Sequence, residues 1–184
     1  MTDRRSLARV GTAAGLVVAA ASARLLPHPP NFTPVAAMAL FAGTCLPSGA
    51  LAFAVPLTAM FASDLVLGIH DLMPVVYLCF GLTVGLGRLV RSRRRPAPVA
   101  LACLSASTLF FAVTNFGVWA AGALYPRTPA GLLECYALAL PFFGNTILGD
   151  AFCTGALFCG YALLERRFPD TGVPHVGARN AASD

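Results

Sequence analysis

Four polar side chains stand inside long apolar runs of this sequence, and their types suit binding chemistry. They are Asp64, Asn115, Asn145 and Asp150, each flanked by apolar residues. An aspartate in the centre of a membrane costs about 2.5–3.5 kcal/mol, so such residues are seldom placed there without a role. Their oxygens accept hydrogen bonds, and the acids also attract cations. The four residues predict either a polar pocket or a hydrogen-bond network between helices, and the sequence leaves both alternatives open.

A proline-rich segment, residues 27–34, adds further candidates. It reads Pro-His-Pro-Pro-Asn-Phe-Thr-Pro, which is too stiff for a floppy connector and suits a fixed lid. Its polar members are His28 and Asn31. Trp119 lies in the same run as Asn115 and would form part of the wall. For His28 a solvated loop, and for Trp119 an anchor at the membrane surface, are the alternative interpretations.

Catalytic and metal-binding motifs are missing from the sequence. It contains no HExxH, GxSxG, P-loop or GxGxxG pattern, and it has no lysine for a Ser–Lys pair. The histidines and aspartates match no ligand spacing, and the six cysteines fall in or beside apolar runs without a CxxC pair. We therefore predict no enzyme activity, no metal and no cofactor.

Composition indicates the elements that must position these residues. Of 184 residues, 57% are hydrophobic and 11% are charged, against about 25% charged in an average soluble domain. A soluble domain of this size could not bury so much apolar surface. The sequence therefore predicts an all-α, polytopic membrane bundle of about six helices.

The apolar runs mark the expected helices. They cover residues 10–23, 33–46, 50–69, 72–90, 97–124 and 145–164. The second run is short for a crossing and predicts a tilted, short or partly re-entrant helix. Residues 131–143 are apolar but contain Glu134 and Pro141, and we assign them to the outer loop before the last span. The prediction is one transmembrane domain, 10–165, between cytoplasmic tails 1–9 and 166–184, the second of them disordered.

Arginine distribution predicts the orientation in the membrane. All thirteen basic residues are arginine. With the N-terminus inside, the inner segments hold eleven of them, and the outer side keeps only Arg24 and Arg127. Because basic residues accumulate in cytoplasmic loops, this predicts six spans with both termini cytoplasmic in a bacterial inner membrane. The net charge of +5 then reflects orientation rather than nucleic-acid binding.

The first run has two interpretations. Its basic start and its Ala-Ser-Ala ending have the form of a cleavable signal peptide, which would remove residues 1–23. However, Gly11, Gly15, Ala19 and Ala23 recur every four residues and form a ridge that lets another helix approach closely. That use requires a retained helix, and the ridge predicts a docking surface for a membrane partner.

Four motifs carry a resemblance to a known group of proteins. They are the segment 27–34, Ser-Asp-Leu at 63–65, Thr-Asn-Phe at 114–116 and Gly-Asn-Thr-Ile-Leu-Gly-Asp at 144–150. In this order they resemble an uncharacterised family of small bacterial six-span membrane proteins. That family is similar to the substrate-binding S components of energy-coupling-factor (ECF) transporters. The likeness covers about residues 8–165.

The resemblance implies a solute site near the outer face under the loop between the first two helices. It also implies a coupling membrane subunit and ATPases as partners. The chain begins Met-Thr, unlike the Met-His of cobalt- and nickel-type members, and no vitamin-specific motif is present.

The predicted function is a solute-binding subunit of an uptake transporter. A pocket rich in acceptors and acid, with almost no outer arginine, suits a small neutral or cationic solute. A structural or assembly protein without a ligand is the alternative, and an enzyme of the membrane face is the third.

Overall fold

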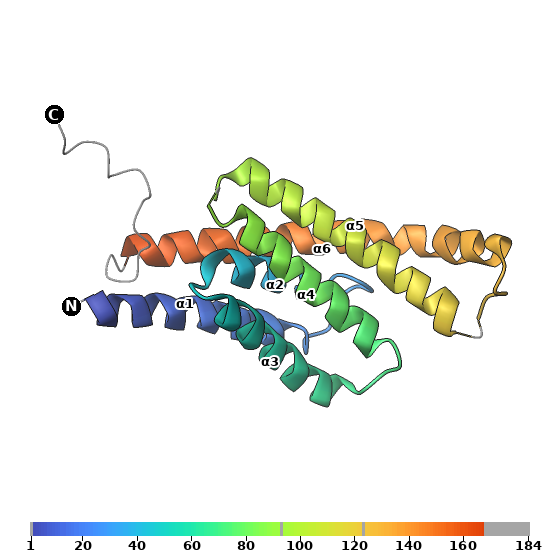
Figure 1. The fold of residues 1–184 in the computed structure, drawn as a ribbon, viewed down its shortest axis with the longest axis horizontal. Coiled ribbons are helices and arrows are strands. Elements are labelled where there is room, and N and C mark those ends of the chain that lie inside the picture. The colour runs from blue at the N-terminus through green and yellow to red at the C-terminus, as the bar shows by residue number, and fades with distance from the viewer. Residues whose placement is uncertain (1, 93, 123, 168–184) are drawn as a thin grey trace.

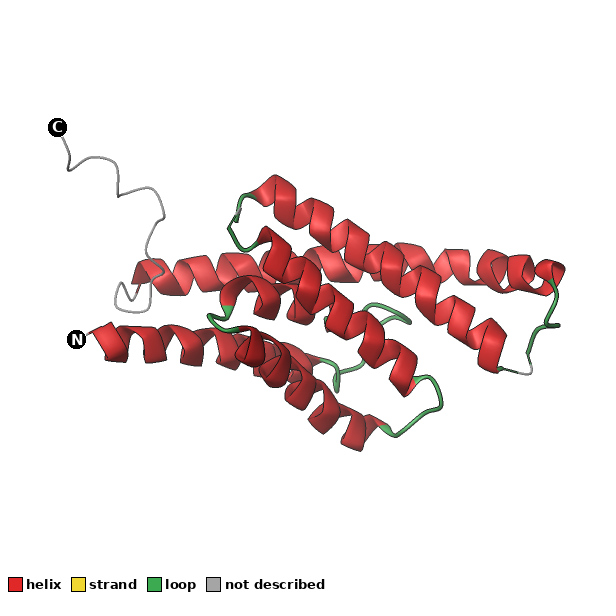
Figure 2. Ribbon diagram, in the orientation of Figure 1, coloured by secondary structure: helices red, strands yellow, loops and turns green. Residues whose placement is uncertain are grey.

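The protein is a bundle of helices. The computed structural model describes residues 2–92, 94–122 and 124–167, and within these ranges all regular structure is helical (Figures 1 and 2). The helices are α1 (Thr2–Ala23), α2 (Val35–Cys45), α3 (Gly49–Leu67), α4 (Met73–Val90), α5 (Pro96–Ala121) and α6 (Pro129–Arg167). The all-α prediction is confirmed. The predicted disorder of the C-terminal tail concerns residues that, beyond Arg167, lie outside the described ranges.

Four of these helices, α3 to α6, are long and apolar enough to cross a membrane. Many of their large side chains point outward, among them Leu65, Leu101 and Leu148, as expected for helices surrounded by lipid. The membrane-protein prediction is therefore supported by helix length as well as by composition. α1 and α2 contribute shorter apolar helices, Leu7–Ala23 and Val35–Cys45.

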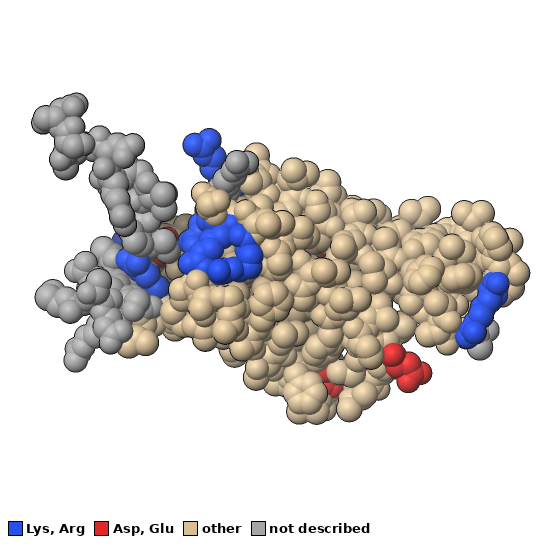
Figure 3. All heavy atoms as spheres, viewed as in Figure 1, with Lys and Arg blue, Asp and Glu red and all other residues tan. Residues whose placement is uncertain are grey.

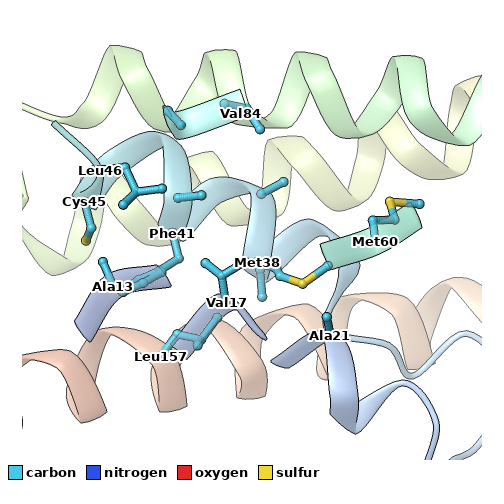
Figure 4. Close-up of a cluster of buried hydrophobic side chains, with 14 of the residues drawn as sticks. Ala13, Val17, Ala21, Met38, Phe41, Cys45, Leu46, Met60, Val84 and Leu157 are labelled. Carbon is cyan, nitrogen blue, oxygen red and sulfur yellow. The ribbon is translucent and has the colours of Figure 1, made fainter. Parts of the chain in front are cut away.

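The short helix α2 forms the centre of the bundle. All of its 11 residues are buried. Figure 4 shows Met38 and Phe41 of α2 among Val17 of α1 and Leu157 of α6, with Val84 of α4 on another side. At about 1.5 Å per residue α2 is roughly 16 Å long, well short of a hydrocarbon core of about 30 Å. Its environment is therefore protein along its whole length.

The closest helix contact joins α2 to α4. Gly43 and Gly87 face each other there, and a Cβ added to Gly87 would lie 3.0 Å from Gly43 Cα and 3.1 Å from Thr44 N. Thr44 Oγ1 donates to the carbonyl of Leu40 at 2.8 Å and lies 3.2 Å from that of Gly87. Only glycine leaves room for this approach, so Gly43 and Gly87 allow α2 and α4 to pack backbone against backbone.

The carboxyl end of α2 meets arginine side chains. Arg88 and Arg91 Nη1 donate to the carbonyl of Leu46, at 3.1 and 2.6 Å, and both also contact the carbonyl of Pro47. Burial, and next the charges of Arg88 and Arg94, lower the pKa of Arg91. Cations at this end complement the negative end of the helix dipole. Figure 3 shows basic side chains gathered at this end of the molecule, near the start of α1.

The last helix differs from the sequence prediction. Residues 131–143, assigned to an outer loop, belong to α6, which runs unbroken through Pro141 for 39 residues. At about 1.5 Å per residue it is roughly 58 Å long, and its first part packs on α5 beyond the other helices (Figure 1). Phe111 of α5 contacts Tyr136 and Phe143 of α6, with ring centroids 5.7 and 4.4 Å apart. These aromatic contacts hold the segment against α5 as helix.

Helix α1 has two different faces. Ala13, Val17 and Ala21 are buried in the core, so removal of residues 1–23 would uncover α2. The ridge predicted from the sequence, formed by Gly11, Gly15, Ala19 and Ala23, is exposed instead. Nothing lies within 4 Å of a Cβ added to either glycine. The ridge is therefore not used to pack the helices of this chain.

Candidate functional site

Asp150 caps the amino end of the central helix. The N-cap residue of this helix is Pro34, whose side chain makes no capping hydrogen bond. The carboxyl group of Asp150, from α6, accepts hydrogen bonds from the backbone N–H groups of Ala37 and Ala36. These are the donors that an N-cap side chain would ordinarily satisfy, and an acid there also complements the positive end of the helix dipole. Ser107 Oγ on α5 donates to Asp150 Oδ2 at 2.7 Å.

Asp150 is almost fully buried, with 3% of its surface exposed. We placed it at the outer opening of the last span, but α6 begins at Pro129, 21 residues earlier, so Asp150 lies in the interior of the helix. Among the described residues, every partner of its carboxyl group is neutral. A buried carboxyl group with neutral partners is uncommon in a membrane helix, because acids inside membranes are usually paired with a cation.

The segment between α1 and α2 lies against α6 above Asp150. Asn145 Nδ2 donates to the carbonyl of Pro30 at 3.1 Å. Asn31 takes a positive φ of 61°, a conformation that asparagine tolerates better than most residues, and turns the chain towards α2. At Gly149 an added Cβ would lie 3.0 Å from Phe32 Cα, so this glycine lets the segment approach the helix. The predicted lid is therefore in contact with the predicted site.

Asp64 holds the beginning of the same segment. Arg24 Nη2 lies 2.8 Å from Asp64 Oδ1, and the two side chains are 12% and 5% exposed. Tyr77 of α4 donates to Asp64 Oδ2 at 2.9 Å. Arg24 Nη1 also donates to Ser63 Oγ. This acid is therefore neutralised by one of the two arginines that the sequence placed on the outer side.

The two remaining polar residues of the membrane runs lie apart from this group. Asn115 Nδ2 donates to Phe111 O of its own helix at 2.8 Å. Trp119 Nε1 donates to Pro126 O at 3.0 Å, in the connection to α6. Asn115 is eight residues from Ser107 along α5, or about 12 Å. These residues stabilise the end of the α5–α6 hairpin and do not meet Asp150.

His28 is an exposed residue of the segment, with Nδ1 3.0 Å from the carbonyl of Pro29. The structure therefore brings together the segment 24–34 with Asn145 and Asp150 on one side and Asp64 on the other. Sequence reasoning missed the three partners Arg24, Tyr77 and Ser107. Arg24 had a signal, since an isolated arginine beside a membrane run on the acid-rich side invites a search for its counter-charge.

An apolar groove lies beside the Arg24–Asp64 pair, between α1 and α3. Its volume is about 560 Å³, and its lining includes Val18, Ala21, Ala54, Thr58 and Ser63. Small and apolar side chains provide space but few hydrogen bonds. The groove therefore does not join the polar residues into one pocket.

The bundle and its polar contacts fall within a single sequence family. The family described as "Family of unknown function (DUF6580)" matches residues 4–171. The chain belongs to this family. No curated protein and no solved structure matches it. In this DUF6580 member the matched range contains the segment 24–34 and both buried acids, so the candidate site lies wholly inside the family region.

Proposed function

We propose that the protein is a membrane-embedded solute-binding subunit, similar to an S component, that captures a small neutral or cationic solute. The solute would enter from the side opposite the arginine-rich end, beneath the segment 24–34. The protein would lie in a bacterial inner membrane with both termini cytoplasmic. α2 would be the second of the six helices, and because it is short it would not span the membrane by itself.

The observation that carries this proposal is the environment of Asp150. Its carboxyl group is buried within α6, has only neutral partners among the residues that the structure describes, and lies under a segment held to α6 by Asn145. A cation or a hydrogen-bond donor can be added to such a group, whereas Asp64 already has Arg24. Asp150 is therefore the residue that would contact the solute.

The covering segment has attachments suited to opening and closing. Arg24 is attached to Asp64 at its start, and Asn145 holds Pro30 in its middle. After the covering segment, the backbone N–H groups of residues 36–37 donate hydrogen bonds to Asp150. A solute that takes hydrogen bonds from Asp150 competes with the amino end of α2, so binding and the position of the segment would be coupled.

The partners implied are a coupling membrane subunit and ATPases. The exposed ridge of Gly11, Gly15, Ala19 and Ala23 would be the docking surface, since small side chains let a second helix approach closely.

A structural or assembly role is the second candidate, and one observation favours it. Asp64, Asn115, Trp119, Asn145 and Asp150 all have hydrogen-bond partners within the chain. Such contacts are what helix-pinning residues would make.

Native mass spectrometry of the protein purified from membranes separates the two. With a solute-binding role, wild-type protein retains a small molecule, Asp150→Asn loses it, and Asp71→Asn keeps it. Asp71 is an exposed acid in the connection between α3 and α4, so it is matched in chemistry but lies away from the site. Absence of a retained molecule, together with a lower melting temperature for Asp150→Asn alone, would support the structural role instead.

A further inference from the structure

A second cavity lies at the arginine-rich end, between α5 and α6. It is a half-open groove of about 560 Å³, which is within the range of ligand sites, about 300–1,000 Å³. Its walls are mainly apolar and include Val99, Leu104, Ile147 and Phe158. Its floor carries the Cys103–Thr154 contact, with Sγ and Oγ1 3.4 Å apart.

Charged residues line the same groove. Arg94 and Arg95 come from the connection between α4 and α5, and Glu165 comes from the last turns of α6. The Nε–H group of Arg94 donates to Arg91 O at 3.3 Å. This N–H group is one of the five donors of a guanidinium. Among the described lining residues, two guanidinium groups and one carboxylate leave a single net positive charge. Figure 3 shows basic side chains at this end of the molecule.

We infer that this groove binds an anionic phospholipid from the leaflet at the arginine-rich end. The phosphodiester would meet Arg94 and Arg95, and an acyl chain would lie along the apolar walls between α5 and α6. Basic pockets between membrane helices on the arginine-rich side recognise lipid headgroups in this way. One phosphodiester charge balances the net charge of the groove. The inference concerns a different ligand from the proposed solute, although the far end of the groove reaches Ser107, the partner of Asp150.

The structure provides variants that test the two halves of the groove separately. Arg94→Gln/Arg95→Gln removes both charges of the headgroup end. Gly155→Leu fills the apolar part, because Gly155 lines the groove and nothing lies within 4 Å of an added Cβ. Gly160→Leu is its control, since Gly160 is on the same helix, is equally open and is not among the lining residues.

In the experiment, delipidated protein is incubated with an equal mixture of phosphatidylglycerol and phosphatidylcholine that have identical acyl chains. Native mass spectrometry then measures how much of each lipid stays bound. Wild-type protein should retain phosphatidylglycerol preferentially. The double arginine variant should bind it about thirtyfold more weakly, on the usual attraction of two arginines for an anionic surface. Gly155→Leu should lose both lipids, while Gly160→Leu should behave as wild type.

A matched charge control is Arg166→Gln/Arg167→Gln, which removes two exposed arginines at the end of α6 that do not line the groove. An equal loss of phosphatidylglycerol in this control would show general surface attraction and overturn the inference. Equal retention of the two lipids by wild-type protein, or full retention by Gly155→Leu, would also overturn it. Far-UV circular dichroism on each variant checks that the helices are intact.

Discussion

The contact between Gly87 of α4 and the central helix makes the sharpest prediction about this fold. A methyl group at Gly87 would overlap the carbonyl oxygen of Leu40 and lie 3.0 Å from Gly43 Cα. These obstacles are backbone atoms, so no side-chain rotation can relieve them. α2 is buried along its whole length, so moving it away from α4 pushes it into α1 and α6. Gly87→Ala must therefore disturb the whole core.

The size of the effect follows from two opposing contributions. Overpacking of this kind destabilises by about 1–3 kcal/mol, and rigid backbone on both sides favours the upper end. Alanine gains about 1 kcal/mol over glycine in a helix. The net expected loss is about 2 kcal/mol. At roughly 2–4 °C per kcal/mol for a protein of this length, the melting temperature should fall by about 4–8 °C.

Gly85→Ala is the matched control on the same helix. Nothing lies within 4 Å of a Cβ added there, so only the helix propensity remains and stability should rise by up to about 1 kcal/mol. Thermal unfolding in detergent, followed with a thiol-reactive dye, would report exposure of the buried Cys45 and Cys79. If Gly87→Ala melts at or above the temperature of Gly85→Ala, the reasoning on the α2–α4 contact is refuted.

Three other experiments probe the polar contacts. Asp150→Ala removes the acceptor for the N–H groups of residues 36–37, at about 1–3 kcal/mol for each unsatisfied donor. Hydrogen exchange at the start of α2 should accelerate, and unchanged exchange would contradict the capping role. Arg24→Gln and Asp64→Asn should show a coupling energy of about 1–3 kcal/mol in a double-mutant cycle of unfolding free energies, because the ion pair is largely buried. Strictly additive effects of the two substitutions would argue against the ion pair. Arg91→Gln removes donors to the carbonyls that follow α2 and should lower the melting temperature by an amount equivalent to about 1 kcal/mol, so an unaltered melting temperature would count against this cap.

Most helices could be predicted closely from apolar runs. The expected run 72–90 became Met73–Val90, and 50–69 became Gly49–Leu67. The prediction was wrong at residues 131–143, because Glu134 and Pro141 suggested a break. The structure continues the helix there, and contacts with α5 such as that between Phe111 and Phe143 support it. A proline interrupts one hydrogen bond, and packing against a neighbouring helix can compensate for it.

Three of the selected polar residues lie near one another in the structure, although their role stays a prediction. Asp64 and Asn145 were selected as costly polar residues in apolar runs, and they bond to Arg24 and Pro30 of the segment 24–34. Asp150 was selected on the same grounds and lies at the start of α2, directly after this segment. Asn115 was selected on the same grounds but bonds to its own helix. Local sequence cannot distinguish these cases, because the difference depends on which neighbour faces the side chain.

The sequence by itself determined the helical class, the membrane environment and the asymmetric arginine distribution. These follow from composition and from the order of apolar runs, which act on each segment independently of the others. Only the tertiary structure decided that the short second run is the buried centre of the bundle, with Asp150 at its amino end and with Arg88 and Arg91 bonded to the carbonyl of Leu46 just past its carboxyl end. The end groups of a helix enclosed by protein need hydrogen-bond partners, and here side chains from elsewhere in the chain supply some of them. Those partners are distant in sequence and meet only when the chain has folded.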